Sequence, residues 1–311
     1  MASVQDEINM TDQLILQSIL EDLKRQNQMP RRIDFSIVGG RFWCVVADKE
    51  LDQLSVINED VYTGFSDSKE VALLKALSER AERYSFIEGY QQKYNSCLTE
   101  RSDGFAAIPK IMDSYSARNN AFNEAVERFV WSTWWDDRTI AFDRKRLTAS
   151  APEVKASEYI QFVFSELDLE YLDIITPWQT LKTHEVQILL GKIKNKGFVS
   201  GGACGPIQDK DHTFLRGLDE LYRHGFAYER SAAKNIVPES LYEKRLSYFA
   251  SGMGNHLVES RLGNVGTNSV ALPDLEIDTT VDSRFSSYHI YRCYFKDQPP
   301  FVGGAMERLC L

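Results

Sequence analysis

The sequence predicts an α+β fold, in which helical and extended segments alternate along the chain. Apolar residues recur at helical spacing in several long segments, and apolar runs typical of strands lie between them. No segment rich in glycine, serine and proline divides the chain, so we expect the elements to form one continuous structure. We predict an N-terminal lobe over residues 1–55, continuous with a main domain over residues 56–311.

The N-terminal lobe is predicted from two local patterns. Apolar residues at helical spacing indicate a helix over residues 12–26. Two short apolar segments, 33–38 and 41–46, flank Gly39-Gly40, which permits the positive φ values of a tight hairpin turn.

The main domain is predicted from the same two periodicities. Further helices are expected over residues 68–86, 114–135 and 212–224, and from Pro238 onward. Strands are expected over residues 158–167 and 186–194, and as short segments beyond Gly252.

Composition limits the functional classes. The 311 residues are 43% hydrophobic, and 36 basic against 45 acidic residues give a net charge of −9. Such a surface repels phosphate backbones and anionic lipids, and no apolar run is long enough to span a bilayer, so we expect neither nucleic-acid nor membrane partners. Five widely spaced cysteines, an odd number, indicate reduced thiols and a cytoplasmic location.

One short motif is repeated within the chain. A shift of 45 residues superimposes two copies of Glu-x-x-Glu-Arg, at residues 79–83 and 124–128, together with the alanines that precede them. A third, weaker copy in the helix over residues 212–224 places Arg216 and Glu220 at equivalent positions.

The spacing places both glutamates of each full copy on one helix face. If the two helices face each other, four carboxylates converge, and such a cluster favours Mg²⁺ with phosphate as a further ligand. Nearby arginines would contact the phosphate oxygens. In the alternative interpretation, each Glu-Arg pair is an ion pair on a solvated helix, and the four glutamates lie apart. The residues concerned are Glu79, Glu82, Glu124 and Glu127.

The segments that flank these copies resemble three motifs of the YcaO family. Residues 64–68 are similar to a glycine-containing turn that opens the first motif helix. Residues 102–107 resemble the loop before the second motif helix, and Gly201-Gly202-Ala203 resembles the glycine-rich turn before an Arg-x-x-x-Glu helix. The resemblance runs in the family's order from Gly64 to Glu220.

The resemblance implies a YcaO-type α+β fold with mixed sheets, whose three motif-bearing helices line a nucleotide site. It implies Mg²⁺ as a cofactor, held by Glu79, Glu82, Glu124 and Glu127. It also implies ATP as a cofactor, bound by Ser102, Asp103, Arg128, Arg216 and Glu220, and it assigns no catalytic nucleophile.

The implied activity is ATP-dependent phosphorylation of a backbone amide oxygen in a ribosomally synthesised precursor peptide. The product would be an azoline, a thioamide or an amidine. We expect a partner protein that presents the peptide, and a homo-oligomer is compatible with the sequence.

Several positions depart from the family pattern. Phe65 stands where many members have lysine, Ser116 where a glutamate precedes the alanine, and Asp103 where asparagine is usual. The chain also lacks the Pro-x-Pro-x-Pro tail that is common in azoline-forming members. These departures indicate a non-azoline member, a member whose catalysis a partner completes, or weakened use of nucleotide. The alternative function is a non-catalytic YcaO-like scaffold subunit of a peptide-modifying complex.

Overall fold

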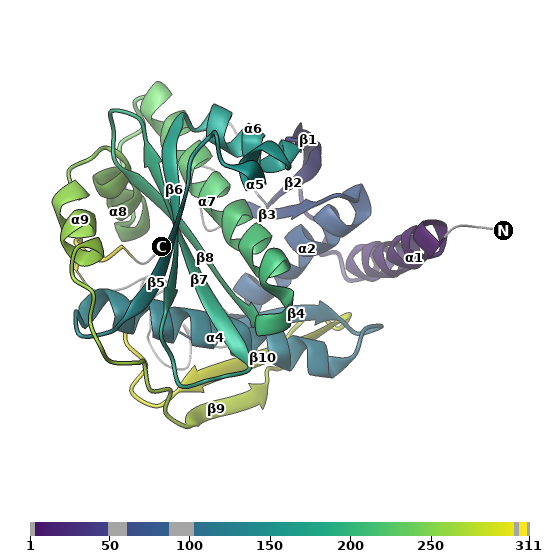
Figure 1. The fold of residues 1–311 in the computed structure, drawn as a ribbon. Coiled ribbons are helices and arrows are strands. Elements are labelled where there is room, and N and C mark those ends of the chain that lie inside the picture. The colour runs from purple at the N-terminus through teal and green to yellow at the C-terminus, as the bar shows by residue number, and fades with distance from the viewer. Residues whose placement is uncertain (1–3, 49–60, 87–102, 302–304, 310–311) are drawn as a thin grey trace. The chain divides into compact units, whose positions relative to one another are not determined.

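The computed structural model describes residues 4–48, 61–86, 103–301 and 305–309, with only the backbone of residues 4–10 (Figure 1). The chain forms two compact units. Unit 1 comprises residues 1–95, 105–121 and 278–292, and unit 2 comprises residues 96–104, 122–277 and 293–311. The boundary that the sequence predicts near residue 55 falls outside the described residues.

Unit 1 contains a three-stranded antiparallel sheet of order β1-β2-β3 and two helices. Gly39 and Gly40 adopt φ values of 54° and 79°, which confirms the predicted hairpin turn. Trp43 and Phe65 stack on neighbouring strands with ring centroids 5.3 Å apart. The elements are α1 (Val4–Arg25), β1 (Arg32–Val38), β2 (Arg41–Ala47), β3 (Val61–Ser66) and α2 (Lys69–Phe86).

Unit 2 is built on an antiparallel sheet of order β5-β6-β7-β8. Its strands are β5 (Phe142–Leu147), β6 (Leu169–Pro177), β7 (His184–Ile193) and β8 (Phe198–Pro206). Its helical elements are α5 (Pro152–Lys155), α6 (Glu158–Glu166), η4 (Ile207–Asp209), α7 (Lys210–Ala233), α8 (Leu241–Ala250) and α9 (Asn255–Leu262).

Two further features have residues in both units. Helix α4 (Ser114–Asp136) enters unit 2 at Phe122. The remaining sheet has the order β4-β10-β9, formed by β4 (Gly104–Pro109), β10 (Tyr288–Phe295) and β9 (Leu275–Thr280). Among the described residues, no helix combines the length and apolarity that a bilayer crossing requires.

The unit 2 sheet is covered on both faces, α7 lying along one of them (Figure 1). A Cβ on Gly201 would lie 2.3 Å from the carbonyl oxygen of Gly217 on α7. A Cβ on Gly202 would lie 2.5 Å from the ring of Trp131 on α4. Because consecutive strand residues point to opposite faces, the two glycines let α7 and α4 approach β8 from opposite sides.

The α+β class and the long helices α2, α4 and α7 are confirmed, but several local predictions are wrong. Residues 158–166 form α6 where a strand is expected over 158–167, because Ser157 caps the N-terminus by accepting a hydrogen bond from the Ile160 N–H and the buried side chains share one helical face. The helix expected from Pro238 begins at Leu241, where Ser240 and Glu243 form a capping box.

The glycine-rich motif segments are also extended where turns or loops are expected. Gly64 lies in β3, residues 104–107 lie in β4, and Gly201-Gly202 lie in β8. Helix α9 replaces one of the short strands expected beyond Gly252. Both sheets with a described register are antiparallel, so mixed strand directions are not found in these two sheets.

Candidate functional site

Three side chains of α7 pair with backbone groups along the outer edge of β8. Arg216 donates from Nη1 to the Cys204 carbonyl oxygen at 3.3 Å, and Glu220 Oε2 accepts from the Gly202 N–H at 2.8 Å. His224 Nδ1 donates to the Ser200 carbonyl oxygen at 2.7 Å. The three side chains are spaced four residues apart on α7, and their backbone partners are spaced two residues apart on β8. Side chains from one face of the helix therefore provide hydrogen bonds to the backbone groups at one edge of the strand.

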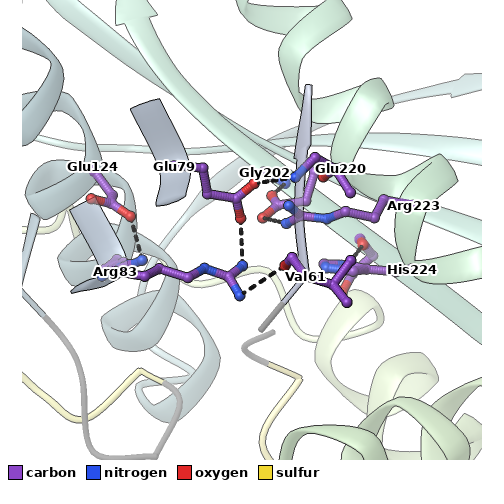
Figure 2. A network of polar contacts seen from close by, with 11 residues as sticks. Val61, Glu79, Arg83, Glu124, Gly202, Glu220, Arg223 and His224 are labelled. Carbon is purple, nitrogen blue, oxygen red and sulfur yellow. Dashed lines mark hydrogen bonds and ion pairs between the residues drawn. The ribbon is translucent and has the colours of Figure 1, made fainter. Parts of the chain in front are cut away.

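The same arrangement occurs within unit 1, between α2 and β3. Lys75 Nζ donates to the Phe65 carbonyl oxygen at 2.8 Å, and Glu79 Oε2 accepts from the Thr63 N–H at 2.7 Å. Arg83 is ion-paired with Glu79 and donates from Nη1 to the Val61 carbonyl oxygen at 3.5 Å. Figure 2 shows the Glu79, Arg83 and Val61 group and the contact of Glu220 with Gly202. These contacts confirm that α7 carries a third copy of the motif, with His224 in the place of Arg83.

The second full copy, on α4, differs at its glutamates. Arg128 is ion-paired with Glu124 and donates to the carbonyl oxygen of Asp103, the residue that precedes β4. Asp103 is buried, and its backbone oxygen is the atom that contacts Arg128. Glu127 is only 9% exposed, and none of the described residues makes a hydrogen bond or ion pair with its carboxylate.

Burial raises the pKa of Glu127 to about 8, and the neighbouring Glu220 carboxylate adds to the shift. The guanidinium of Arg216 opposes it. A side chain on Gly202 would bring its Cβ within 3.3 Å of Glu127 Oε1, so the glycine also makes room for this carboxylate. Glu127 is therefore a buried acid that lies against β8 near a second carboxylate.

Glu220 is the second acid of this group. Burial raises its pKa, and the Arg223 guanidinium and the Gly202 N–H oppose the rise. Arg223 Nη2 lies 3.4 Å from Glu220 Oε1 (Figure 2). Unit 2 thus brings together three carboxylates and three guanidinium groups, which are Glu124, Glu127, Glu220, Arg128, Arg216 and Arg223.

The other predicted site residues are distributed as follows. Glu79 and Glu82 lie on α2 in unit 1, and Ser102 lies outside the described residues. Within the described part of the chain, no three His, Cys, Asp or Glu side chains are close enough to hold a metal ion as they lie. In both full copies a motif arginine is ion-paired with the first glutamate, so a cation there would have to displace it.

The small residues before the glutamates have a packing role. Ala72 and Ala76, which precede Glu79 on α2, are buried against β3. A Cβ on Gly64 would lie 2.1 Å from the Ala72 carbonyl oxygen. The small residues on both sides permit close approach of helix and strand.

Two residues of the site carry weak sequence signals. His224 follows Glu220 by four residues, as Arg83 follows Glu79, so the third copy of the motif indicates its position. The ring of Phe301 lies 5.6 Å from the Arg128 guanidinium, and it is far from α4 in sequence, so no local pattern indicates that contact. Cys204 and Trp131 are buried core residues of unit 2.

The sequence matches no protein-family model, and no curated protein is significantly similar to it. Solved structures are similar in fold. YcaO from Methanopyrus kandleri, solved with AMPPCP and Mg²⁺, aligns with a TM-score of 0.60 at 13% identity, over 94% of this chain and 92% of that one.

A chain of the E. coli microcin synthetase McbBCD complex aligns with a TM-score of 0.57 at 10% identity, over 88% of this chain and 89% of that one. The same complex with pro-MccB17 bound aligns equally well. These alignments extend over nearly the whole length of each chain. The chain described here has the YcaO fold.

Proposed function

We propose that this chain is a YcaO-family protein that binds ATP with Mg²⁺ and activates a peptide backbone amide by phosphoryl transfer. Three observations support the proposal: the fold, the repeated acidic motif, and the cluster of carboxylates and guanidinium groups that the motif residues form in unit 2. The proposed metal residues are Glu79, Glu82, Glu124 and Glu127, and the proposed ATP residues are Ser102, Asp103, Arg128, Arg216 and Glu220.

The observation that carries the proposal is the buried carboxylate of Glu127. A carboxylate that is nine-tenths buried without a hydrogen-bond partner among the described residues is costly to ionise. Its raised pKa expresses that cost, and a bound cation would remove it. Because the donor set consists of carboxylate oxygens, it fits a hard cation such as Mg²⁺ better than a thiophilic metal.

The roles of the residues follow from their chemistry. Bound Mg²⁺ would neutralise phosphate charge and orient the γ-phosphate for transfer. Arg128 and Arg216 would bind phosphate oxygens, because a guanidinium offers two parallel donors to such groups. Transfer of the γ-phosphoryl group to the amide oxygen turns that oxygen into a leaving group, which a nucleophile then displaces from the carbon.

The proposal is tested by calorimetric titration of the purified chain with AMPPCP in the presence of Mg²⁺. We expect binding by the unsubstituted protein and a loss of at least tenfold in affinity for Glu127→Gln and Glu124→Gln. Glu276→Gln, at an exposed strand position, serves as the control. Absence of binding by the unsubstituted protein, or unchanged affinity in both motif variants, would refute the proposal.

A second candidate function is a non-catalytic scaffold subunit of a peptide-modifying complex. The observation that favours it is the position of Phe65, where many YcaO proteins have lysine. This side chain is 5% exposed and stacks on Trp43, so it belongs to the core of unit 1 and offers no cation to a phosphate. Nucleotide binding with no phosphate release in the presence of peptide and partner would favour the scaffold.

We propose a ribosomally synthesised precursor peptide as the substrate and a partner protein that presents it. The structures of the McbBCD complex, one of them with pro-MccB17 bound, support both. We propose azoline, thioamide or amidine as the product classes and the cytoplasm as the location. The chain is incubated with ATP, Mg²⁺, the partner and the peptide. Measurement of the released phosphate tests turnover, and the mass of the modified peptide distinguishes the products.

A further inference from the structure

The end of the described chain in unit 2 lies along α4. Four contacts join the described residues of this C-terminal segment, 298–301 and 305–309, to the helix. They are Gln298 Nε2 to the Ala125 oxygen at 3.3 Å, Ser132 Oγ to the Pro300 oxygen at 3.5 Å, Trp135 Nε1 to the Glu307 oxygen at 3.2 Å, and Arg308 Nε to Asp136 Oδ1 at 3.0 Å. These contacts extend along α4 from Ala125, within the acidic motif, to Asp136 at the end of the helix.

Phe301 is the residue of this segment whose side chain contacts the motif arginine, Arg128. The Arg128 guanidinium carbon lies 5.6 Å from the centroid of its ring, within the range of a cation–π interaction. The Trp131 ring contacts the same phenyl group edge-on, with centroids 5.4 Å apart. Phe301 is 2% exposed, so its ring is fixed by packing.

The backbone of Phe301 is held from the other side by Arg245 on α8. This arginine is fully buried and donates from Nη1 to the Phe301 carbonyl oxygen at 3.1 Å. It also donates from Nε and Nη2 to the Ala305 carbonyl oxygen at 3.0 Å and 2.8 Å. The ring that faces Arg128 is thus anchored to a helix other than α4.

Arg128 is consequently restrained by three different groups. Glu124 pairs with one side of its guanidinium, the Asp103 carbonyl oxygen accepts from another nitrogen, and the Phe301 ring lies against it. Arginine loses considerable rotamer freedom when it binds a ligand, and a side chain already restrained in place loses less.

We propose that Phe301 is a positioning residue, which holds Arg128 in the orientation that binds the phosphates of the nucleotide. The C-terminal segment thereby contributes to the site through Arg128, without touching the ligand itself. This inference rests on the proposed function, since it assigns Arg128 to nucleotide phosphate.

The test compares two phenylalanines that both pack on α4. Phe301→Leu removes the ring beside Arg128, whereas Phe295→Leu removes a ring that contacts Phe122 and Phe129 and not Arg128. AMPPCP affinity with Mg²⁺ and the unfolding temperature are measured for both variants and for Phe301→Tyr, which keeps the aromatic face. We expect Phe301→Leu to weaken AMPPCP binding about fivefold, because Arg128, no longer restrained by the ring, would then lose its rotamer freedom on binding.

We expect Phe295→Leu to bind as the unsubstituted protein does, even where its unfolding temperature falls as far, and Phe301→Tyr to regain most of the affinity. Equal affinities for Phe301→Leu and Phe295→Leu would show a packing role only and overturn the inference while leaving the proposed function intact. Absence of AMPPCP binding by the unsubstituted protein would overturn the proposed function, and this inference with it.

Discussion

The carboxylate of Glu220 accepts a hydrogen bond from the backbone N–H of Gly202 at 2.8 Å, and so closes the open edge of β8. Glu79 makes the same bond to Thr63 at 2.7 Å. Two motif glutamates therefore satisfy backbone donors of an edge strand, a contact that requires an acceptor oxygen and not a negative charge. This distinguishes them from Glu127, which makes no such bond with the described residues.

Two substitutions of Glu220 distinguish the role of its acceptor oxygen from the role of its negative charge. Glu220→Gln keeps an oxygen for the Gly202 N–H, so we expect little change in the free energy of unfolding. Glu220→Ala leaves this N–H without its acceptor and should lower the free energy of unfolding by about 1–3 kcal/mol. Urea denaturation measures both, and equal stabilities for the two variants would contradict the role given to this bond.

Gly202 is expected to tolerate no side chain. In Gly202→Ala the new methyl group would lie 2.5 Å from the Trp131 ring, and the ring belongs to a buried core side chain that cannot move freely. We expect a loss of about 1–3 kcal/mol in the free energy of unfolding. Gly263→Ala, whose Cβ would meet its nearest neighbour at 3.3 Å, is the control and should lose clearly less.

The titration of Glu127 should make stability depend on pH. Its pKa of about 8 in the folded protein exceeds the ordinary 4.5, so between these values the folded state holds a proton that the unfolded state has lost. The free energy of unfolding therefore falls as the pH rises towards 8. Without nucleotide or Mg²⁺, we expect a decrease of about 1–2 kcal/mol between pH 6.5 and 8.

This pH window is chosen because His224 acts in the opposite sense below it. Burial lowers the pKa of His224 to about 3 from 6.5, so stability falls as the pH drops from 6.5 towards 3. Urea denaturation at several pH values gives the slope. Glu127→Gln should reduce the decrease above pH 6.5, since Glu220 is then the only acid of this pair with a raised pKa, and Glu276→Gln should retain it in full; a slope unchanged in Glu127→Gln would refute this assignment.

Introducing a lysine at position 65 should destabilise the protein. Phe65→Lys removes a ring stacked on Trp43 and places an ammonium group in the core of unit 1, so we expect a loss of about 3 kcal/mol or more. Ile37→Lys, at a position 71% exposed on β1, should change stability by less than about 0.5 kcal/mol. Thermal unfolding compares the two, and a stable Phe65→Lys variant would show that this site accepts a cation.

Patterns within single segments predict the helices α2, α4 and α7, because each repeats apolar residues at helical spacing. The prediction fails at residues 158–167, where aromatic and β-branched residues suit a strand as well as a buried helix. Ser157, which caps the N-terminus of α6, favours the helix over the strand. The glycine-rich segments are misread for a related reason, since glycine serves turns and closely packed strands equally.

The sequence by itself determined the repeated acidic motif and the family whose fold the chain shares, because both depend on the order and spacing of residues within short segments. Only the tertiary structure decided what each motif residue contacts. Glu220 meets a strand edge, Glu127 is buried beside it, and Phe301 reaches Arg128 from the far end of the chain. Those contacts join segments distant in sequence, and no local periodicity encodes which strand edge a helix will cover.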